Sequence, residues 1–194
     1  MITNSVLDCI RARRSTRSFL DRPVEKRQLE TLLDAAVWAP SGSNSQSWLF
    51  TAVTDKDVLL KINELVRQGF QTWTPDDDYP GKQMAKTMSQ REDYNFYHRA
   101  PALIIASNRP NYENAMADCA LALENVFLAA QSLGLGSCYV NQLHWLRGDD
   151  ALRGYLSTLG IPKEHTICNS AAVGHIGTAS AAPPRREGTV RIIK

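Results

Sequence analysis

The sequence of 194 residues predicts one α+β layered domain, and three observations support this prediction. Hydrophobic residues make up 43% and charged residues 22%, so the chain can bury enough apolar surface to offset its conformational entropy. Apolar residues recur at helical spacing in some segments and form continuous strand-like runs in others. The sequence contains no internal repeat and no linker, so we expect residues 1–194 to form a single domain.

The first third of the chain is predicted to contain two helices, two polar loops and one strand. Apolar positions at helical spacing predict a short helix over residues 3–13, and the polar run after it predicts a loop. Residues 24–39 carry the apolar stripe of an amphipathic helix, which Pro40 ends. Small and polar residues then predict a loop over 41–47, and the apolar residues that follow predict a strand over 48–53.

The next segment gives clear signals only at its two ends. Asp55 is expected to cap a helix whose apolar positions follow directly. Proline, glycine and acidic residues predict a loop over 74–81, but the pattern is indistinct across 67–99 as a whole. The continuous apolar run over 102–106 is typical of a strand that is covered on both faces, so we expect it to lie at the centre of the sheet.

A long helix is predicted from Asn114 or Met116 through Leu133, and Gly134 is expected to end it. Its apolar residues lie nearly all round the axis, which is typical of a helix in a core or at a subunit interface. Four further elements are predicted toward the C-terminus: strands over 137–140 and 167–173, a helix over 149–158, and an edge pairing of 190–193.

Charge and cysteine content argue against several classes of protein. The net charge of +2 is far below what nucleic acids or anionic membrane surfaces require, whereas the basic residues near the N-terminus suit a small phosphate ligand. Four scattered cysteines without a C-x-x-C pair predict reduced thiols and no metal site. No apolar run approaches the roughly 18 to 20 residues of a membrane span. We therefore expect a cytoplasmic protein that binds neither nucleic acid nor membranes.

Two polar segments are candidates for a ligand site. The first offers guanidinium and hydroxyl groups that can hold a phosphate, from Arg13, Arg14, Ser15 and Arg17. A solvated basic loop is the alternative interpretation. The second offers hydroxyl and amide groups to a planar polar heterocycle, from Ser41, Ser43 and Asn44. An ordinary helix-to-strand loop uses the same residue types, so that alternative also stays open.

Other motifs of known chemistry are missing from the sequence. The glycines of L-G-L-G-S-C-Y at 133–139 lack the third glycine of a dinucleotide fingerprint, and they lie between a helix and a strand in the wrong order. No phosphate-binding G-x-x-x-x-G-K motif, H-E-x-x-H motif or G-x-S-x-G motif is present, and the four histidines lack metal-ligand spacing. We therefore assign no catalytic side chain and no metal ligand.

Taken together and in order, four segments resemble the nitroreductase family: R-R-S-T-R at 13–17, A-P-S-G-S-N-S-Q-S-W at 39–48, L-A-A-Q-S-L-G-L-G-S at 128–137 and A-V-G-H-I-G at 172–177. The resemblance spans about residues 10–186 and is loose over 67–99. It implies a three-layer α/β/α sandwich with a mixed, mainly antiparallel central sheet. It also implies an obligate homodimer with two FMN sites at its interface.

The resemblance also implies roles for individual residues. Arg13 and Ser15 match positions that hold the FMN phosphate and ribityl chain, within the motif that includes Arg14, and Arg17 matches a cation near flavin N1 and O2. The phosphate site is completed by Arg185 and Arg186. The loop that reaches the flavin from the partner subunit carries Ser41, Ser43 and Asn44.

A strand end matches the position where the backbone approaches the flavin N5 edge, and it consists of Tyr139, Val140, Asn141 and Gln142. Two departures from the family pattern occur. Glycine or a carboxylate is common around Asn141 and Gln142, so the amides here could alter which substrate fits above the ring. Ser47 replaces the usual proline before the tryptophan, which loosens the loop.

The function that the resemblance implies is ping-pong oxidoreduction: NADH or NADPH reduces FMN, and an electron-poor small molecule such as a nitroaromatic or quinone then reoxidises it. The flavin would carry the chemistry, which fits the absence of a catalytic triad. Two alternatives stay open: a flavoenzyme of the same fold with another reaction, such as dehydrogenation, dehalogenation or flavin breakdown, and a non-catalytic flavin-binding sensor or storage protein. The physiological acceptor and the preferred nicotinamide are left undetermined.

Overall fold

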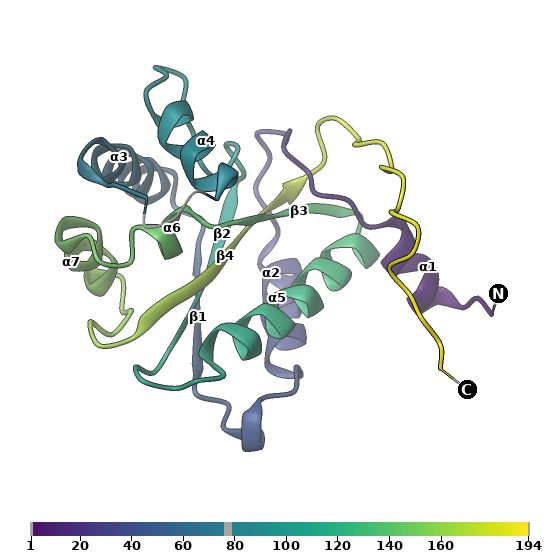
Figure 1. Cartoon of the computed structure of the whole chain (residues 1–194). Helices are drawn as coiled ribbons and strands as arrows, with labels where there is room; N and C mark the ends of the chain where they lie inside the picture. Colours follow the sequence, from purple (N-terminus) through teal and green to yellow (C-terminus); the bar gives the residue numbers. More distant parts are fainter. Residues whose placement is uncertain (1, 76–78, 194) are drawn as a thin grey trace.

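The computed structural model describes residues 2–75 and 79–193, and its centre is a four-stranded antiparallel sheet (Figure 1). The strand order is β1-β2-β4-β3, with β1 at Trp48–Val53, β2 at Ala102–Asn108, β3 at Leu135–Val140 and β4 at Thr166–His175. Phe50 lies opposite Ala106, and Cys138 lies opposite Ala172. The predicted central position of the 102–106 run is confirmed, because every residue of β2 is buried.

Helices cover both faces of this sheet, which gives the expected three layers (Figure 1). One layer contains α2 (Lys26–Val37) and α5 (Ala115–Ser132), and the other contains α3 (Lys56–Thr72), α4 (Pro80–Ser89), α6 (Gln142–Trp145) and α7 (Asp150–Thr158). The remaining helices are α1 (Ser5–Ala12), beside the C-terminal tail, and the 3₁₀ turn η1 (Gly42–Asn44) between α2 and β1. No helix of the described chain is long and apolar enough to cross a membrane.

Strand β2 illustrates how the sequence builds two cores. Leu103 and Ile105 pack in the core on the α3 side, whereas Ala102, Ile104 and Ala106 pack in the core on the α5 side. Successive side chains of a strand point to opposite faces of the sheet, so a strand buried on both faces needs an unbroken apolar run. The same apolar run that predicted a central strand therefore supplies side chains to both cores.

Helix ends follow the predicted signals. The Asp55 carboxylate accepts hydrogen bonds from the backbone N–H groups of Asp57 and Val58, at 2.9 and 3.0 Å, and so caps α3. Gly134 follows α5 with a φ of 71°, in the left-handed region where a residue without Cβ carries no steric cost. These two ends fix where α3 begins and where β3 can start.

The N-terminal segment pairs with the edge strand β3. Ser15 forms a parallel bridge with Ser137, and the Thr16 amide donates to the Ser137 carbonyl at 2.8 Å. Gly136 permits this approach, because a Cβ at that position would lie 2.5 Å from the Thr16 hydroxyl oxygen. The segment therefore lies directly against the sheet instead of forming a solvated loop.

Three expectations need correction. The predicted loop over 74–81 includes residues 76–78, which lie outside the described residues, and its last two positions, Pro80 and Gly81, instead open α4. Proline is tolerated in the first helical turn because its missing N–H would have no partner there. Residues 190–193 form no strand, since the described tail after residue 179 has no sheet partner. The short helix α6 was not predicted.

The contact between Gly136 and Thr16 gives a testable prediction. Gly136→Ala should lower the free energy of unfolding by about 1–3 kcal/mol, because the new methyl group overlaps a buried side chain that is held by the backbone pairing. Hydrogen exchange at the Thr16 amide should also become faster. Gly154→Ala is the matched control: it adds a methyl group inside α7 with nothing within 4 Å, and it should leave stability unchanged or higher. Wild-type stability and protection in Gly136→Ala would contradict the prediction.

Candidate functional site

A cavity of about 460 Å³ opens where the N-terminal segment, α4, α6 and residues 91–99 meet. We call it the Arg17 cavity. Its walls include a cation, two methionines, a phenol, an imidazole and an amide, from Arg17, Met84, Met88, Tyr94, His98 and Gln142. Arg17 and Gln142 were both singled out from the sequence, and the structure brings them to one space although 125 positions separate them.

Two polar atoms at this cavity are buried without a partner. The Tyr94 hydroxyl and the Gln142 side-chain oxygen have no hydrogen-bond partner among the described residues. Burial raises the pKa of Tyr94 well above its usual range, and the neighbouring Gln142 amide offsets only part of this rise. The phenol therefore stays protonated at neutral pH and is available as a donor, while Gln142 offers an acceptor. Buried groups of this kind indicate a ligand, because leaving them unpaired costs free energy.

The chain around Tyr94 is fixed by Asn63 of α3. Asn63 donates from its side-chain nitrogen to the Tyr94 carbonyl at 3.0 Å, and its side-chain oxygen accepts from the Phe96 amide at 3.1 Å. Burial and the positive charge of Arg17 both lower the pKa of His98, so its neutral form is favoured. Arg17 and Arg99 thus supply the positive charge at this cavity together with Arg91, which is paired with Asp93.

Arg13 lies at the other end of the same N-terminal segment, where α1 ends, and its side chain packs against α5. Its Nε atom is 3.7 Å from the Glu124 carboxylate, and its guanidinium group lies 6.0 Å from the centre of the Phe127 ring. Arg14 turns away from this position, because its Nη1 atom donates to the carbonyl groups of Arg11 and Arg13, each at 2.6 Å. Arg13 therefore presents a charge beside α5, whereas Arg14 closes the end of α1.

The end of β3 leads directly into the Arg17 cavity. The Tyr139 hydroxyl is a hydrogen-bond partner of the Asn169 amide, and its ring makes an edge contact with Phe127. The Val140 carbonyl accepts from the Ser170 hydroxyl at 2.9 Å, which fixes the last residue of the strand. Asn141 precedes α6 without capping it through its side chain, and Gln142 begins this helix. The predicted strand-end residues are thus contiguous with the cavity wall.

The loop with Ser41, Ser43 and Asn44 lies elsewhere, at the N-terminal end of α5. Buried Asp118 accepts from the Gly42 amide at 3.1 Å, and the Tyr112 hydroxyl also donates to this carboxylate at 2.9 Å. Ser43 and Asn44 both have a φ of 53°, which is an uncommon conformation for residues with a Cβ. None of the described residues that line the Arg17 cavity comes from this loop, so one chain does not bring the two candidate segments together.

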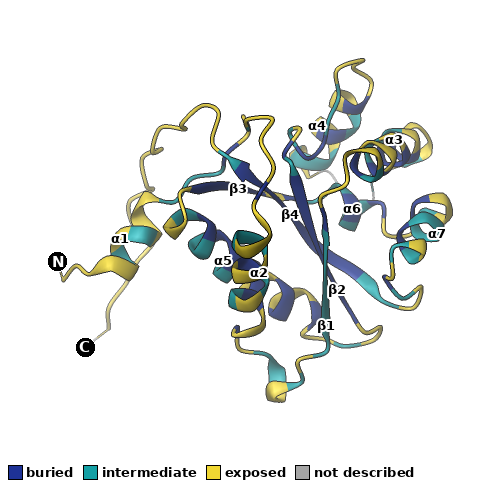
Figure 2. Cartoon of the chain, turned by 180° about the vertical axis from the view of Figure 1, so that it is seen from behind, coloured by how far each residue is buried: buried dark blue, intermediate teal, exposed yellow. Residues whose placement is uncertain are grey.

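Arg185 and Arg186 lie in the exposed C-terminal tail. This tail runs beside α1 in both views (Figures 1 and 2), and its first part is held where the Ser180 hydroxyl donates to the Ser15 carbonyl at 3.2 Å. Within the described chain, neither guanidinium group has an ion pair or hydrogen bond. The structure thus places the tail next to the Arg13 segment without fixing the two late arginines.

Sequence reasoning missed three residues that shape these segments: Tyr94, Asn63 and Asp118. The run Y-N-F-Y-H at 94–98 was a usable signal, because closely spaced aromatic residues in a segment without helical periodicity suggest a packed, functional loop. Asp118 was also detectable as an acidic residue within an otherwise apolar helix, since a buried carboxylate requires partners.

The comparisons agree with this geometry. The model of the Nitroreductase family matches residues 10–175. A solved nitroreductase with bound FMN from Bacteroides fragilis NCTC 9343 has 36% identity and a TM-score of 0.91, covering 99% of this chain and 100% of the other. An FMN reductase [NAD(P)H] of Bacillus subtilis is 28% identical, and the match covers 94% of this chain and 70% of that protein. A 4-nitrobenzoate reductase of a Nocardioides species is also 28% identical, and the match covers 86% of this chain and 78% of that protein. This chain belongs to the nitroreductase family and has its α+β fold.

Proposed function

We propose that this chain is an FMN-dependent oxidoreductase that uses NADH or NADPH to reduce nitroaromatic, quinone or related electron-poor acceptors. The observation that carries the proposal is the N-terminal segment along β3, with Arg13 at one end and Arg17 in the cavity at the other. Four extended residues span roughly 13 Å, which suits an elongated ligand with a phosphate at one end and a flat ring at the other. Family membership supports FMN as that ligand.

The side chains present fit this cofactor. Arg13 and the Ser15 hydroxyl would hold the phosphate and ribityl chain, with Arg185 and Arg186 of the adjacent tail completing the phosphate site. Tyr94 and Gln142 would supply a donor and an acceptor at the Arg17 cavity, where both side chains have an unpaired buried atom. The polar edge of a flavin or of a substrate stacked on it would satisfy both groups.

The chemistry that bound FMN supplies is hydride uptake from NAD(P)H followed by electron transfer to the acceptor. Arg17 would hold a positive charge next to the bound flavin, where it would stabilise the reduced form. Tyr139, Val140 and Asn141 at the end of β3 would approach the flavin through their backbone, and Gln142 would contribute its side chain from the cavity wall. Donor and acceptor would occupy the same cavity in turn, which is the ping-pong order.

We further propose a cytoplasmic homodimer. Helix α1 touches α5 through Cys9, whose thiol donates to the Leu128 carbonyl at 3.3 Å, but it has no buried residue and is largely exposed (Figure 2). Its apolar side chains Val6 and Ile10 are 60% and 46% exposed. Burial against a second subunit would remove this apolar surface from water. The same association would bring Ser41, Ser43 and Asn44 of the partner to the cofactor. A monomeric FMN-bound species in sedimentation experiments would contradict the homodimer.

The deciding experiment is an anaerobic visible spectrum of the FMN-supplemented protein. NADH or NADPH should bleach the yellow flavin, and a nitroaromatic should then restore the oxidised spectrum. Bound flavin that stays oxidised with both donors would instead favour a sensor or storage protein. A protein that binds no flavin would overturn the proposal.

Arg13→Ala should weaken FMN retention by about 1.5–3 kcal/mol, because it removes a charge-assisted contact to the phosphate. Ultrafiltration of the holoprotein and fluorescence of the released flavin measure this loss. Glu124→Gln is the matched control: it removes the carboxylate beside Arg13 but keeps the guanidinium group, so it should not weaken FMN retention. Equal FMN affinity in wild type and Arg13→Ala would exclude Arg13 from the phosphate site.

Arg17→Ala should lower the two-electron reduction potential of bound FMN by about 30–60 mV. The reason is that a charge-assisted contact contributes about 1.5–3 kcal/mol, and the cation would make this contact with the reduced form. Equilibration against reference dyes measures the potential. Arg27→Ala is the charge control, because it removes an exposed arginine of α2, on the opposite face of the sheet from the cavity. An unchanged potential in Arg17→Ala, or an equal shift in both variants, would contradict the assignment.

A further inference from the structure

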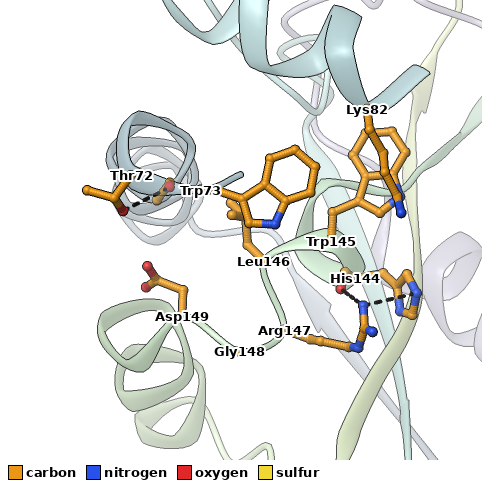
Figure 3. Close-up of a pocket in the computed structure, with 10 residues that line it drawn as sticks. Thr72, Trp73, Lys82, His144, Trp145, Leu146, Arg147, Gly148 and Asp149 are labelled. Atoms are coloured by element: carbon orange, nitrogen blue, oxygen red, sulfur yellow. Dashed lines mark hydrogen bonds between the residues drawn. The ribbon is translucent and has the colours of Figure 1, made fainter. Parts of the chain in front are cut away.

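A second cavity of about 550 Å³ lies beside the Arg17 cavity, among α3, α4, α6 and the start of α7 (Figure 3). We call it the indole cavity, because two tryptophans line it. The residues that matter here are Trp73, Lys82, His144, Trp145, Arg147 and Asp149. The sequence motifs discussed above include none of these side chains, and only Trp145 among them also lines the Arg17 cavity.

Trp73 is held in place from two sides. Its ring centre lies 5.3 Å from that of Phe70, a buried residue of α3, in an edge-on contact of 77°. Its carbonyl accepts from the Lys86 ammonium group of α4 at 2.5 Å. Trp73 and Trp145 thus supply two aromatic surfaces to one cavity, and an aromatic ring binds such surfaces by stacking.

Arg147 supplies a positioned cation. Its Nη1 atom donates to the His144 carbonyl at 3.0 Å and lies 3.4 Å from His144 Nε2. His144 Nδ1 is 2.9 Å from the Ile167 carbonyl and donates to it, which fixes the orientation of the ring beside Arg147. Among the described residues, the Nε and Nη2 atoms of Arg147 have no hydrogen-bond partner. This geometry holds one side of the guanidinium group and leaves the other side to a ligand.

Two further charged side chains among the described residues line this cavity. Lys82 of α4 adds a second positive side chain to its lining. The Asp149 carboxylate also lines the space, but it caps α7 by accepting from the Leu152 amide at 2.8 Å, so its charge interacts with a helix N-terminus. A ligand that combines a flat aromatic ring with phosphate groups matches two indoles and the open side of the Arg147 guanidinium group.

The position of the indole cavity beside the Arg17 cavity favours a ligand long enough to occupy both. Trp145 lines both cavities, and neighbouring residues of α4 divide between them, with Gly81 in the Arg17 cavity and Lys82 in the indole cavity. A nicotinamide dinucleotide contains two ring systems joined by phosphates, whereas a nitroaromatic or quinone has one compact ring system. With the nicotinamide in the Arg17 cavity, the adenosine phosphate half would need a second site close by, and the indole cavity adjoins it at Trp145.

We propose that the indole cavity binds the adenosine phosphate half of the NAD(P)H donor, with the adenine on the indole surfaces and a phosphate at the open side of Arg147. This assignment rests on the proposed function, because it presumes a nicotinamide dinucleotide as the reductant. It names the part of the chain that would select the donor, which neither the sequence motifs nor the flavin site specifies.

Calorimetric titration of the FMN-loaded protein with ADP tests this site without turnover. Wild type should bind ADP, and Arg147→Ala should bind it at least about tenfold more weakly, as expected for loss of a charge-assisted contact. Trp73→Leu should also weaken binding. Arg27→Ala, which removes an exposed arginine of α2, is the charge control and should bind like wild type. Absence of ADP binding in wild type, or equal binding in wild type and Arg147→Ala, would overturn the assignment.

Rapid-reaction kinetics then distinguish this assignment from the proposed function. In Arg147→Ala, the dissociation constant for NADPH obtained from flavin reduction should rise at least about tenfold. Reduced nicotinamide mononucleotide, which lacks the adenosine half, should show the same dissociation constant with wild type and variant. If NADPH reduces the flavin but both donors are equally affected or unaffected, the indole-cavity assignment fails and the proposed function stands. If neither NADH nor NADPH reduces bound flavin in wild type, the proposed function itself fails.

Discussion

The pairing of the N-terminal segment with the edge of β3 is the interaction on which the candidate site depends. The bridge of Ser15 to Ser137 and the hydrogen bond of the Thr16 amide hold an otherwise irregular segment against a rigid strand. This pairing covers part of an exposed sheet edge. It also places Arg17 at the wall of a cavity, while the Arg13 side chain lies against α5. It is possible because Gly136 lacks a Cβ. A backbone constraint, and not the arginines alone, therefore gives the basic motif its geometry.

The rest of the site is built by helices that pack on one face of the sheet. Apolar residues of α3, α4, α6 and α7 share one core with β2, so a side chain such as Asn63 can fix the Tyr94 segment from a rigid helix. The opposite face is covered by α2 and α5, where Asp118 anchors the Ser41 loop. The two predicted ligand segments therefore lie on different sides of the sheet in one chain, and in the proposed homodimer they would meet across the subunit interface.

Local sequence patterns predicted the elements whose burial is periodic or continuous. The amphipathic stripe of α2, the capping residue Asp55 and the apolar run of β2 each depend on neighbouring residues alone, and each has its expected place.

Helix α4 was missed because Pro80 and Gly81 are turn residues in most contexts, although proline also fits a first helical turn. The proximity of Tyr94 and Gln142 arises from tertiary packing across 48 positions, so no local pattern encodes it. The apolar side chains of Val190, Ile192 and Ile193 predicted a strand, but strand formation requires a partner edge, and these residues have none within the described chain.

Two adjoining cavities would resolve a conflict that ping-pong catalysis creates. One redox cavity must accept a defined donor and then an acceptor of variable shape, and tight complementarity to either would impair the other. Met84 and Met88 line the Arg17 cavity, and their flexible thioether chains adapt to rings of different outline. If the adenosine half of the donor binds at Trp73 and Arg147, its affinity comes from contacts that the acceptor never makes. Donor selectivity would then be separated in space from acceptor tolerance, and Trp145 would be the wall common to both.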